Sequence, residues 1–156
     1  MERACTVPFV PKWRCPSPLG AGKEGRNETM KTVLVDAMNT FVIRDEGIFQ
    51  SMFDLLEQYP NRKIILTGAN DEQMEKFGLN KMPYEIFTLK HDPEKADPRY
   101  YEMMLAHFGL TPSDVIYFEH DESAVKSAQS VGITTYHYDK DKKDLEGLKN
   151  FLDSNL

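Results

Sequence analysis

The sequence has few cysteines, no long apolar run and no excess of basic residues. Its two cysteines, Cys5 and Cys15, both lie near the N-terminus, so the rest of the chain has no disulfide framework. No apolar run approaches the roughly 18 residues that a membrane-spanning helix needs. The formal net charge of −6 and the pI near 5.2 disfavour a nucleic-acid-binding surface, which needs clustered Lys and Arg. These absences predict a cytoplasmic protein that binds neither nucleic acid nor membranes.

The first 29 residues differ in composition from the rest of the chain. They hold four of the nine prolines and a Gly-rich polar stretch at residues 20–25. Such a segment offers little apolar surface to offset the entropy lost on ordering. We therefore expect residues 1–29 to be a disordered N-terminal tail and residues 30–156 to form one domain. A metal or redox site at Cys5 and Cys15 is the disfavoured alternative, because no paired Cys/His set accompanies them.

From residue 30 onward, short apolar runs alternate with segments of helical periodicity. Strands are predicted at residues 32–36, 63–67, 84–89, 114–118 and 134–138, and helices at 48–59, 71–77, 98–108, 123–131 and 144–152. Continuous apolar strands joined by helices indicate a parallel sheet that is buried on both faces. The predicted fold class is therefore α/β.

Chemically active side chains follow the predicted strands. Asp36 ends the first strand, Thr67 and Gly68 end the second, and residues 119–121 (Glu-His-Asp) follow the fourth; Lys95 precedes the helix that leads to it. Ligands of parallel sheets bind beyond the C-terminal strand ends, near the point where strand order reverses. A carboxylate that can attack, with a lysine and backbone amides to hold charged oxygens, suits phosphoryl transfer.

Four segments of residues 31–156 resemble, in order, the motifs of the haloacid dehalogenase (HAD) superfamily. They are residues 33–40, 64–67, 95–98 and 117–132. The resemblance implies that Asp36 is the nucleophile, that Thr67 binds the transferring phosphoryl group and that Lys95 stabilises charge. It also implies a Rossmann-like core with strand order 5-4-1-2-3, counted along the chain. Gly68 and Asn39, which follow the same strands, are further candidates for substrate binding.

Two residues depart from the pattern of the family's phosphatases. Met38 stands where those enzymes carry a second Asp that acts as general acid, and a thioether cannot transfer a proton. His120 aligns with the usual metal-binding Asp, flanked by Glu119 and Asp121. The predicted metal ligands are Asp36, the Met38 carbonyl, Glu119 and His120, with Asp121 as an alternative to Glu119. The resemblance implies Mg²⁺, whereas an imidazole favours Mn²⁺ or Zn²⁺; a hydrogen-bonded loop histidine is the competing interpretation of His120.

The spacing of the motifs leaves no room for a cap domain. About 30 residues separate Asp36 from Thr67, and fewer than 30 separate Thr67 from Lys95. An uncapped site resembles those of family members that act on macromolecules or that close the site by forming a homo-oligomer. The expected partner is therefore a phosphorylated small molecule or macromolecule.

Two hypotheses of function remain open from the sequence. The first is a metal-dependent phosphohydrolase that acts through an aspartyl-phosphate at Asp36, with activity weakened by Met38. The second is a catalytically degenerate relative that binds a phosphorylated ligand or a protein partner without turnover. Asp36, Thr67 and Lys95 favour the hydrolase, whereas Met38 and His120 favour the degenerate relative.

Overall fold

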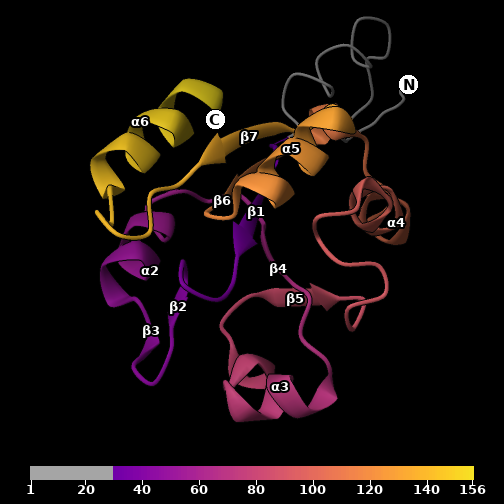
Figure 1. Cartoon of the computed structure of the whole chain (residues 1–156). Coiled ribbons are helices and arrows are strands. Elements are labelled where there is room, and N and C mark those ends of the chain that lie inside the picture. The colour runs from indigo at the N-terminus through magenta and orange to yellow at the C-terminus, as the bar shows by residue number, and fades with distance from the viewer. Residues whose placement is uncertain (1–29) are drawn as a thin grey trace, which may run out of the picture. The chain divides into compact units, whose positions relative to one another are not determined.

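The structure is a computed structural model that describes residues 30–156 (Figure 1). The predictions for residues 1–29, including those for Cys5 and Cys15, lie outside this part of the chain. The described elements are β1 (Thr32–Asp36), β2 (Val42–Ile43), β3 (Gly47–Ile48), α2 (Gln50–Leu56), β4 (Lys63–Thr67), α3 (Asp71–Lys76), β5 (Glu85–Thr88), α4 (Pro98–Phe108), β6 (Val115–Glu119), α5 (Glu122–Ser130), β7 (Thr134–His137) and α6 (Leu145–Asn155). Short 3-10 helices at Leu79–Lys81 and Pro112–Asp114 precede β5 and β6.

Five strands form one parallel sheet in the order β5-β4-β1-β6-β7. These are the five predicted strands, and their order is the predicted 5-4-1-2-3 read from the opposite edge. Strand β1 lies at the centre, paired with β4 on one side and β6 on the other. The next strand of this sheet along the chain, β4, pairs on one side of β1, whereas β6, which comes after β5 in the chain, pairs on the other side. The C-terminal end of β1 is therefore the switch point at which such sheets bind ligands.

Helices cover both faces of the sheet, as the apolar strands predict. Successive residues of a strand point to opposite faces. Val33 and Val35 of β1 belong to a buried cluster with residues of α2 and α6, whereas Leu34 belongs to a second cluster with residues of α4 and α5. All five residues of β1, β4 and β6 are buried. The central strands are thus fixed between two layers, which holds their C-terminal ends in place.

Local signals fix the start of the two helices that flank the site. The Asp97 side chain accepts a hydrogen bond from the Arg99 amide, Pro98 occupies the first turn of α4, and Gly109 ends the helix in the left-handed conformation. The Asp121 side chain caps α5 in the same way through the Ser123 amide. These caps place Lys95 just before α4, and residues 119–121 just before α5.

The structure adds one element that the sequence did not predict, a short antiparallel hairpin made by β2 and β3. Each strand has only two residues, too few to show a periodicity, and Ile48 and Phe49 fit the apolar pattern of the following helix. The predicted helix at 48–59 is accordingly shorter, over Gln50–Leu56. Within residues 30–156 there is no separate cap domain, and no helix is long and apolar enough to cross a bilayer.

Candidate active site

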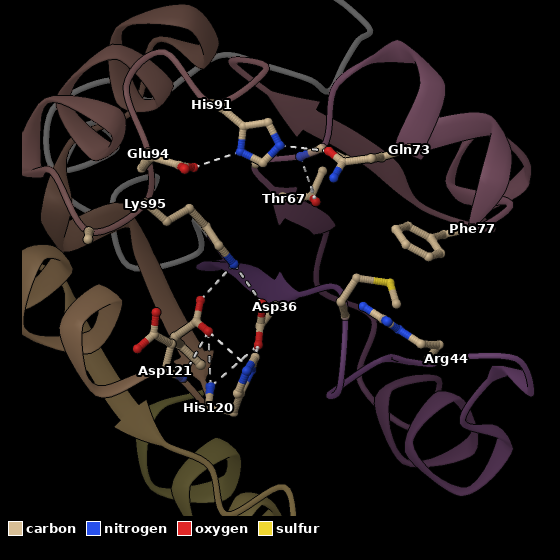
Figure 2. Close-up of a pocket in the computed structure, with 15 residues that line it drawn as sticks. Asp36, Arg44, Thr67, Gln73, Phe77, His91, Glu94, Lys95, His120 and Asp121 are labelled. Carbon is tan, nitrogen blue, oxygen red and sulfur yellow. Dashed lines mark hydrogen bonds and ion pairs between the residues drawn. The ribbon is translucent and has the colours of Figure 1, made fainter.

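A pocket of about 470 Å³ opens at the C-terminal ends of β1, β4 and β6 (Figure 2). Asp36 comes from β1, Thr67 from β4, Glu119 from β6 and Lys95 from the loop before α4. The sheet topology brings together residues that are distant in sequence, such as Asp36 and Glu119, which are 83 positions apart. The volume lies in the range of small-molecule sites.

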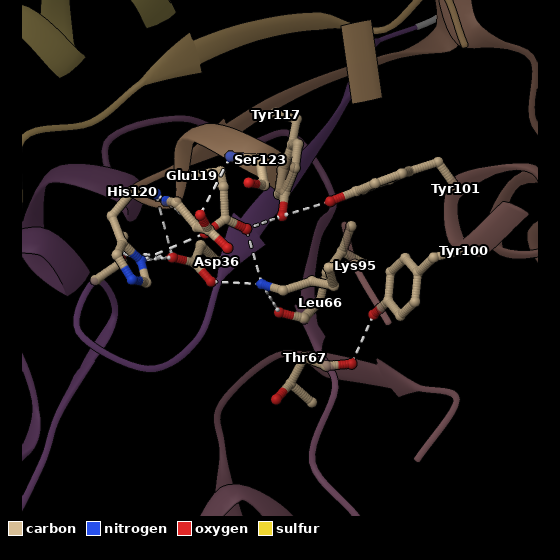
Figure 3. Close-up of polar contacts among 12 residues, drawn as sticks. Asp36, Leu66, Thr67, Lys95, Tyr100, Tyr101, Tyr117, Glu119, His120 and Ser123 are labelled. Carbon is tan, nitrogen blue, oxygen red and sulfur yellow. Dashed lines mark hydrogen bonds and ion pairs between the residues drawn. The ribbon is translucent and has the colours of Figure 1, made fainter. Parts of the chain in front are cut away.

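The Asp36 carboxylate is fully hydrogen-bonded at the floor of this pocket (Figure 3). Its Oδ1 atom lies 2.6 Å from the Lys95 ammonium, and its Oδ2 atom accepts a hydrogen bond of 2.7 Å from the Thr40 hydroxyl. The His120 Nδ1 atom also contacts Oδ2. Only 2% of the Asp36 side chain is exposed. The predicted nucleophile is therefore held in one orientation by three neighbours.

Lys95 bridges the two buried carboxylates. Its Nζ atom lies 2.8 Å from Glu119 Oε1, in addition to its contact with Asp36. Burial works against the charged lysine, but the two carboxylates outweigh it and hold the pKa of Lys95 well above its ordinary value. Burial likewise opposes ionisation of Asp36, but the Lys95 charge prevails and lowers the pKa of Asp36. At neutral pH both groups are charged, as a nucleophilic carboxylate requires.

Each carboxylate oxygen of Glu119 accepts hydrogen bonds from two donors. Oε1 accepts from Lys95 and from the Tyr117 hydroxyl, and Oε2 accepts from the backbone amides of His120 and Asp121, each at 3.1 Å. Burial, with a further contribution from the nearby Asp36 charge, raises the pKa of Glu119 to about 7. The two carboxylates of the floor therefore differ in proton affinity.

His120 lies beside both carboxylates at the edge of the floor. Its side chain is 19% exposed, and its Nδ1 atom contacts Asp36 and lies 3.3 Å from Glu119 Oε2. Burial opposes protonation of the ring, but the hydrogen bond to Asp36 outweighs it and raises the pKa of His120. Ligand atoms of Asp36, Glu119 and His120 lie within 4.8 Å of one another, close enough to share a cation. Three of the four predicted metal ligands thus meet, and Met38 lines the same pocket.

Comparisons with known proteins identify the fold. No family model and no curated protein matches the sequence. Among solved structures, a HAD family enzyme from Bacteroides thetaiotaomicron superposes with TM-score 0.57 at 14% identity, covering 69% of this chain and 93% of that one. This crystal holds an Asp-to-Ala mutant in complex with magnesium and inorganic phosphate, and the wild-type protein in the same complex superposes with TM-score 0.52. The chain has the haloacid dehalogenase-like fold. An uncharacterized protein from Corynebacterium glutamicum, 15% identical, covers 78% of the chain and 96% of its own length with TM-score 0.50.

The remaining predicted site residues of this HAD-like domain fall into two groups. Thr67 and Gly68 line the pocket, where the Thr67 hydroxyl accepts a hydrogen bond from the Ala69 amide and a Cβ on Gly68 would lie 3.3 Å from Glu94 Oε1. Asn39 is exposed and is not among the residues that line the pocket. Its backbone is left-handed, with φ 65°, and forms the turn that precedes the hairpin. The structure therefore brings Thr67 and Gly68 to the site but not Asn39.

Several residues that line the pocket or contact its floor have no sequence pattern that points to the site. Tyr117, which donates to Glu119, reads as an ordinary core aromatic of a buried strand. The His91 ring nitrogens lie 2.8 Å from Glu94 Oε1 and 2.6 Å from Gln73 Oε1, across the pocket (Figure 2). Arg44 reaches the pocket from the hairpin. Since the hairpin itself was not predicted, nothing pointed to Arg44.

Proposed function

We propose that this HAD-like domain is a metal-dependent phosphohydrolase that forms an aspartyl-phosphate at Asp36. One observation carries the proposal: a charged, immobilised Asp36 carboxylate lies at the switch point of the sheet and faces a pocket of substrate size. Thr67 and Lys95 line the same pocket. A carboxylate nucleophile with a neighbouring cation is the arrangement that phosphoryl transfer needs.

Each of these residues has a distinct part in the proposed reaction. The Lys95 charge keeps Asp36 ionised and Thr40 fixes its second oxygen, so that one carboxylate oxygen can attack phosphorus. The bond from phosphorus to the leaving oxygen breaks as the new bond forms, and the leaving group departs with the electron pair. Lys95, the Thr67 hydroxyl and the amide at Gly68 would hold the phosphoryl oxygens. Water then hydrolyses the acyl phosphate, which releases inorganic phosphate and restores the Asp36 carboxylate.

Met38 restricts the substrates that such a site can cleave. It lines the pocket two residues after the nucleophile, and its side chain has no proton to give. General acid catalysis contributes roughly 10²–10⁴-fold to rate, so an alkoxide that must leave unaided reacts slowly. Aryl and acyl phosphates, whose leaving groups are stable anions, are therefore the preferred substrates of this proposal.

The residues present fit a divalent cation with some preference for nitrogen ligands. Asp36, Glu119 and His120, with the Met38 carbonyl, would hold the cation, which supplies charge neutralisation to the transferring phosphoryl group. An imidazole in this set favours Mn²⁺ or Zn²⁺ over Mg²⁺. The Bacteroides enzyme of the same fold forms a complex with magnesium and inorganic phosphate, which supports a divalent cation in the proposed reaction. Because the contact with Asp36 raises the pKa of His120, the ring would have to lose a proton before Nδ1 could bind a cation.

Turnover of paired substrates tests the reaction. The wild type with Mn²⁺, Zn²⁺ or Mg²⁺ should hydrolyse 4-nitrophenyl phosphate and scarcely hydrolyse glycerol phosphate. Asp36→Asn should abolish both activities, and Met38→Asp should raise activity on glycerol phosphate more than on the aryl ester. If Asp36→Asn retains wild-type turnover and Met38→Asp changes nothing, the activity does not arise from this chemistry.

Calorimetry in two buffers of different ionisation enthalpy tests the metal. Mn²⁺ and Zn²⁺ should bind more tightly than Mg²⁺, and binding should release a proton because the ligand atoms exchange a proton for the cation. Glu119→Gln and His120→Ala should each weaken binding by about 10-fold or more. Tight Mg²⁺ binding that survives both substitutions would contradict this placement.

Binding without turnover is the second candidate function. It is favoured by the hydrogen bonds that already occupy the carboxylates at the floor of the pocket. Every carboxylate oxygen of Asp36 and Glu119 already has a donor, and the general-acid position is Met38. Such a site could hold a phosphorylated small molecule or macromolecule in its open pocket. A wild type that cleaves no ester and forms no aspartyl-phosphate with any of the three metals would establish this alternative.

A further inference from the structure

Arg44 is a cation at the rim of the pocket, on the side away from Lys95. It directly follows β2, and a turn with Asp45 in the left-handed conformation leads on to β3. The Glu46 amide donates to the Ile43 carbonyl and closes this turn. The hairpin thus presents Arg44 at a fixed point of the backbone, beside the pocket that Asp36 floors.

The Arg44 side chain lies over an aromatic ring and has no acidic partner in the described residues. Its guanidinium carbon is 5.5 Å from the centroid of Phe77, and Figure 2 shows its nitrogen atoms directed toward the centre of the pocket. It makes no ion pair or hydrogen bond with any residue of 30–156. The other two arginines of this part, Arg62 and Arg99, pair with Glu85 and Asp97.

Arg44 lies between the pocket and a neighbouring hollow. Met38, Arg44 and Phe77 line both the pocket and this hollow, which has a volume of about 350 Å³ and lies between the hairpin and α3. Asp45, Glu75 and Lys76 also line the hollow, and none of them forms an ion pair with Arg44. A ligand with its phosphate at Asp36 would therefore meet two apolar side chains and then a guanidinium. Guanidinium groups bind oxyanions through two parallel hydrogen bonds and stay charged at any physiological pH.

We propose that Arg44 recognises a second oxyanion on the leaving group of the substrate, with the flat apolar part of that group against Met38 and Phe77. The inference rests on the proposed function and narrows its substrate class to anionic aryl phosphates. It agrees with Met38 at the general-acid position, because a phenolic leaving group can depart without a proton donor. It also gives a role to the one arginine whose charge no described acid neutralises.

Binding to a non-cleaving variant tests this inference apart from catalysis. The ligands are phenyl phosphate and its 3- and 4-carboxy derivatives, titrated by calorimetry into Asp36→Asn protein. One carboxylated ester should bind about tenfold more tightly than phenyl phosphate, the size expected of a charge-assisted contact at a half-open rim. Arg44→Gln in the same background should remove this preference. Arg44→Lys should keep part of it, since lysine retains the charge but cannot form the two parallel hydrogen bonds of a guanidinium.

Arg62→Gln is the matched control, because Arg62 also lies over a phenylalanine ring but precedes β4, at the opposite end of that strand. It should leave the preference unchanged. Equal binding of all three esters, absence of binding of all three, or a preference that survives Arg44→Gln would overturn the inference. Thermal melts of each variant check that it is folded.

Turnover then separates the inference from the proposed function. If wild type cleaves the carboxylated ester with higher kcat/KM and Arg44→Gln removes the advantage, both are supported. If wild type cleaves every ester alike and Arg44→Gln has no effect, the hydrolase stands and the role of Arg44 falls. If the Arg44-dependent binding preference is present but no ester is cleaved, the rim is confirmed as a binding element and the hydrolase falls.

Discussion

At the floor of the pocket, Asp36, Lys95 and Glu119 are buried and each charged group faces a partner. At the rim, Arg44 is exposed, lies over the Phe77 ring and forms no ion pair within residues 30–156. The floor comes from the ends of buried central strands and from the capped start of α4. The rim comes from a hairpin of two-residue strands and from the end of a six-residue helix.

The two regions should therefore respond differently to substitution. Buried charges must be balanced by one another, so removing one floor residue leaves another charge buried without its partner. A charge at an exposed rim keeps its hydration and needs no partner for folding. Substitutions at the floor should therefore alter stability and the proposed activity together, whereas those at the rim should alter ligand preference with little change in stability.

The largest expected effect follows from removing Lys95. Lys95→Met leaves two buried carboxylates side by side without their shared cation. We expect the free energy of unfolding at pH 8 to fall by roughly 3–5 kcal/mol, the cost of stranding buried charge. Urea denaturation followed by circular dichroism measures the change. Lys126→Met, which removes an exposed i,i+4 pair with Glu122, should change it by less than about 0.5 kcal/mol; similar losses in both variants would contradict the comparison.

The floor should also make stability depend on pH. Burial raises the pKa of Glu119 from 4.5 to about 7, so the folded state holds a proton that the unfolded chain has lost between these values. Stability of the metal-free protein should therefore fall as pH rises from about 4.5 through 7, by on the order of 3 kcal/mol. The raised pKa of His120 acts in the same direction, since its contribution is present below pH 6.5 and is lost as pH rises through the folded pKa.

Urea titrations of metal-free protein at a series of pH values check this dependence. Glu119→Gln should flatten the slope, because an amide has no proton to lose in this range. Glu122→Gln, three residues along on the exposed side of α5, is the control and should preserve the slope. A wild type whose stability is constant from pH 5 to 8 would rule out the proton affinity described for Glu119.

The fold was predictable from the sequence because several independent local patterns indicate its strands and helices. Residues 32–36 and 63–67 have apolar centres of β-branched and aliphatic residues at 33–35 and 64–66, which favour buried strands, and both strands have the predicted bounds. The Asp97-Pro98 start and the Gly109 stop of the helix at 98–108 are local signals that do not depend on tertiary contacts. Once parallel topology was inferred, the gathering of Asp36, Thr67 and Lys95 followed.

What could not be predicted depends on very short elements, on the last residue of a strand and on the conformation of a turn. The pairing of Val42 with Ile48 extends over two residues and leaves no periodic pattern. Tyr117 and Glu119 are two residues apart on one side of β6, but the predicted strand ended at residue 118, so Glu119 was not placed on it. Asn39 was expected at the site from its place after β1, but a left-handed turn at that residue accompanies its absence from the pocket lining.

Removing the Tyr117 hydroxyl should lower the stability of the protein moderately. Tyr117→Phe keeps the ring in the sheet but takes one donor from buried Glu119. We expect stability at pH 8 to fall by about 1–3 kcal/mol, and less at pH 5, where protonated Glu119 needs fewer donors. Tyr101→Phe, whose hydroxyl reaches Tyr117 at 3.4 Å and not the carboxylate, should cost less. Equal losses at both pH values would show that Glu119 does not sense this hydroxyl.

The smallest expected change in stability lies at the rim, where Phe77→Leu removes the ring under Arg44. Phe77 is only partly buried, and its cation–π contact with an exposed guanidinium contributes about 0.5–1 kcal/mol. The free energy of unfolding should therefore change by no more than about 1 kcal/mol.

The effect of Phe77→Leu on ligand preference should be larger, since the ring limits where the Arg44 side chain can lie. We expect the preference for a carboxylated aryl phosphate, measured by calorimetry in Asp36→Asn protein, to fall about threefold. Phe108→Leu is the matched control, because it removes the ring under Arg62 at the other end of the sheet. It should alter stability through packing and leave the preference intact; if it weakened the preference as much as Phe77→Leu does, ligand selection would not be a property of the rim.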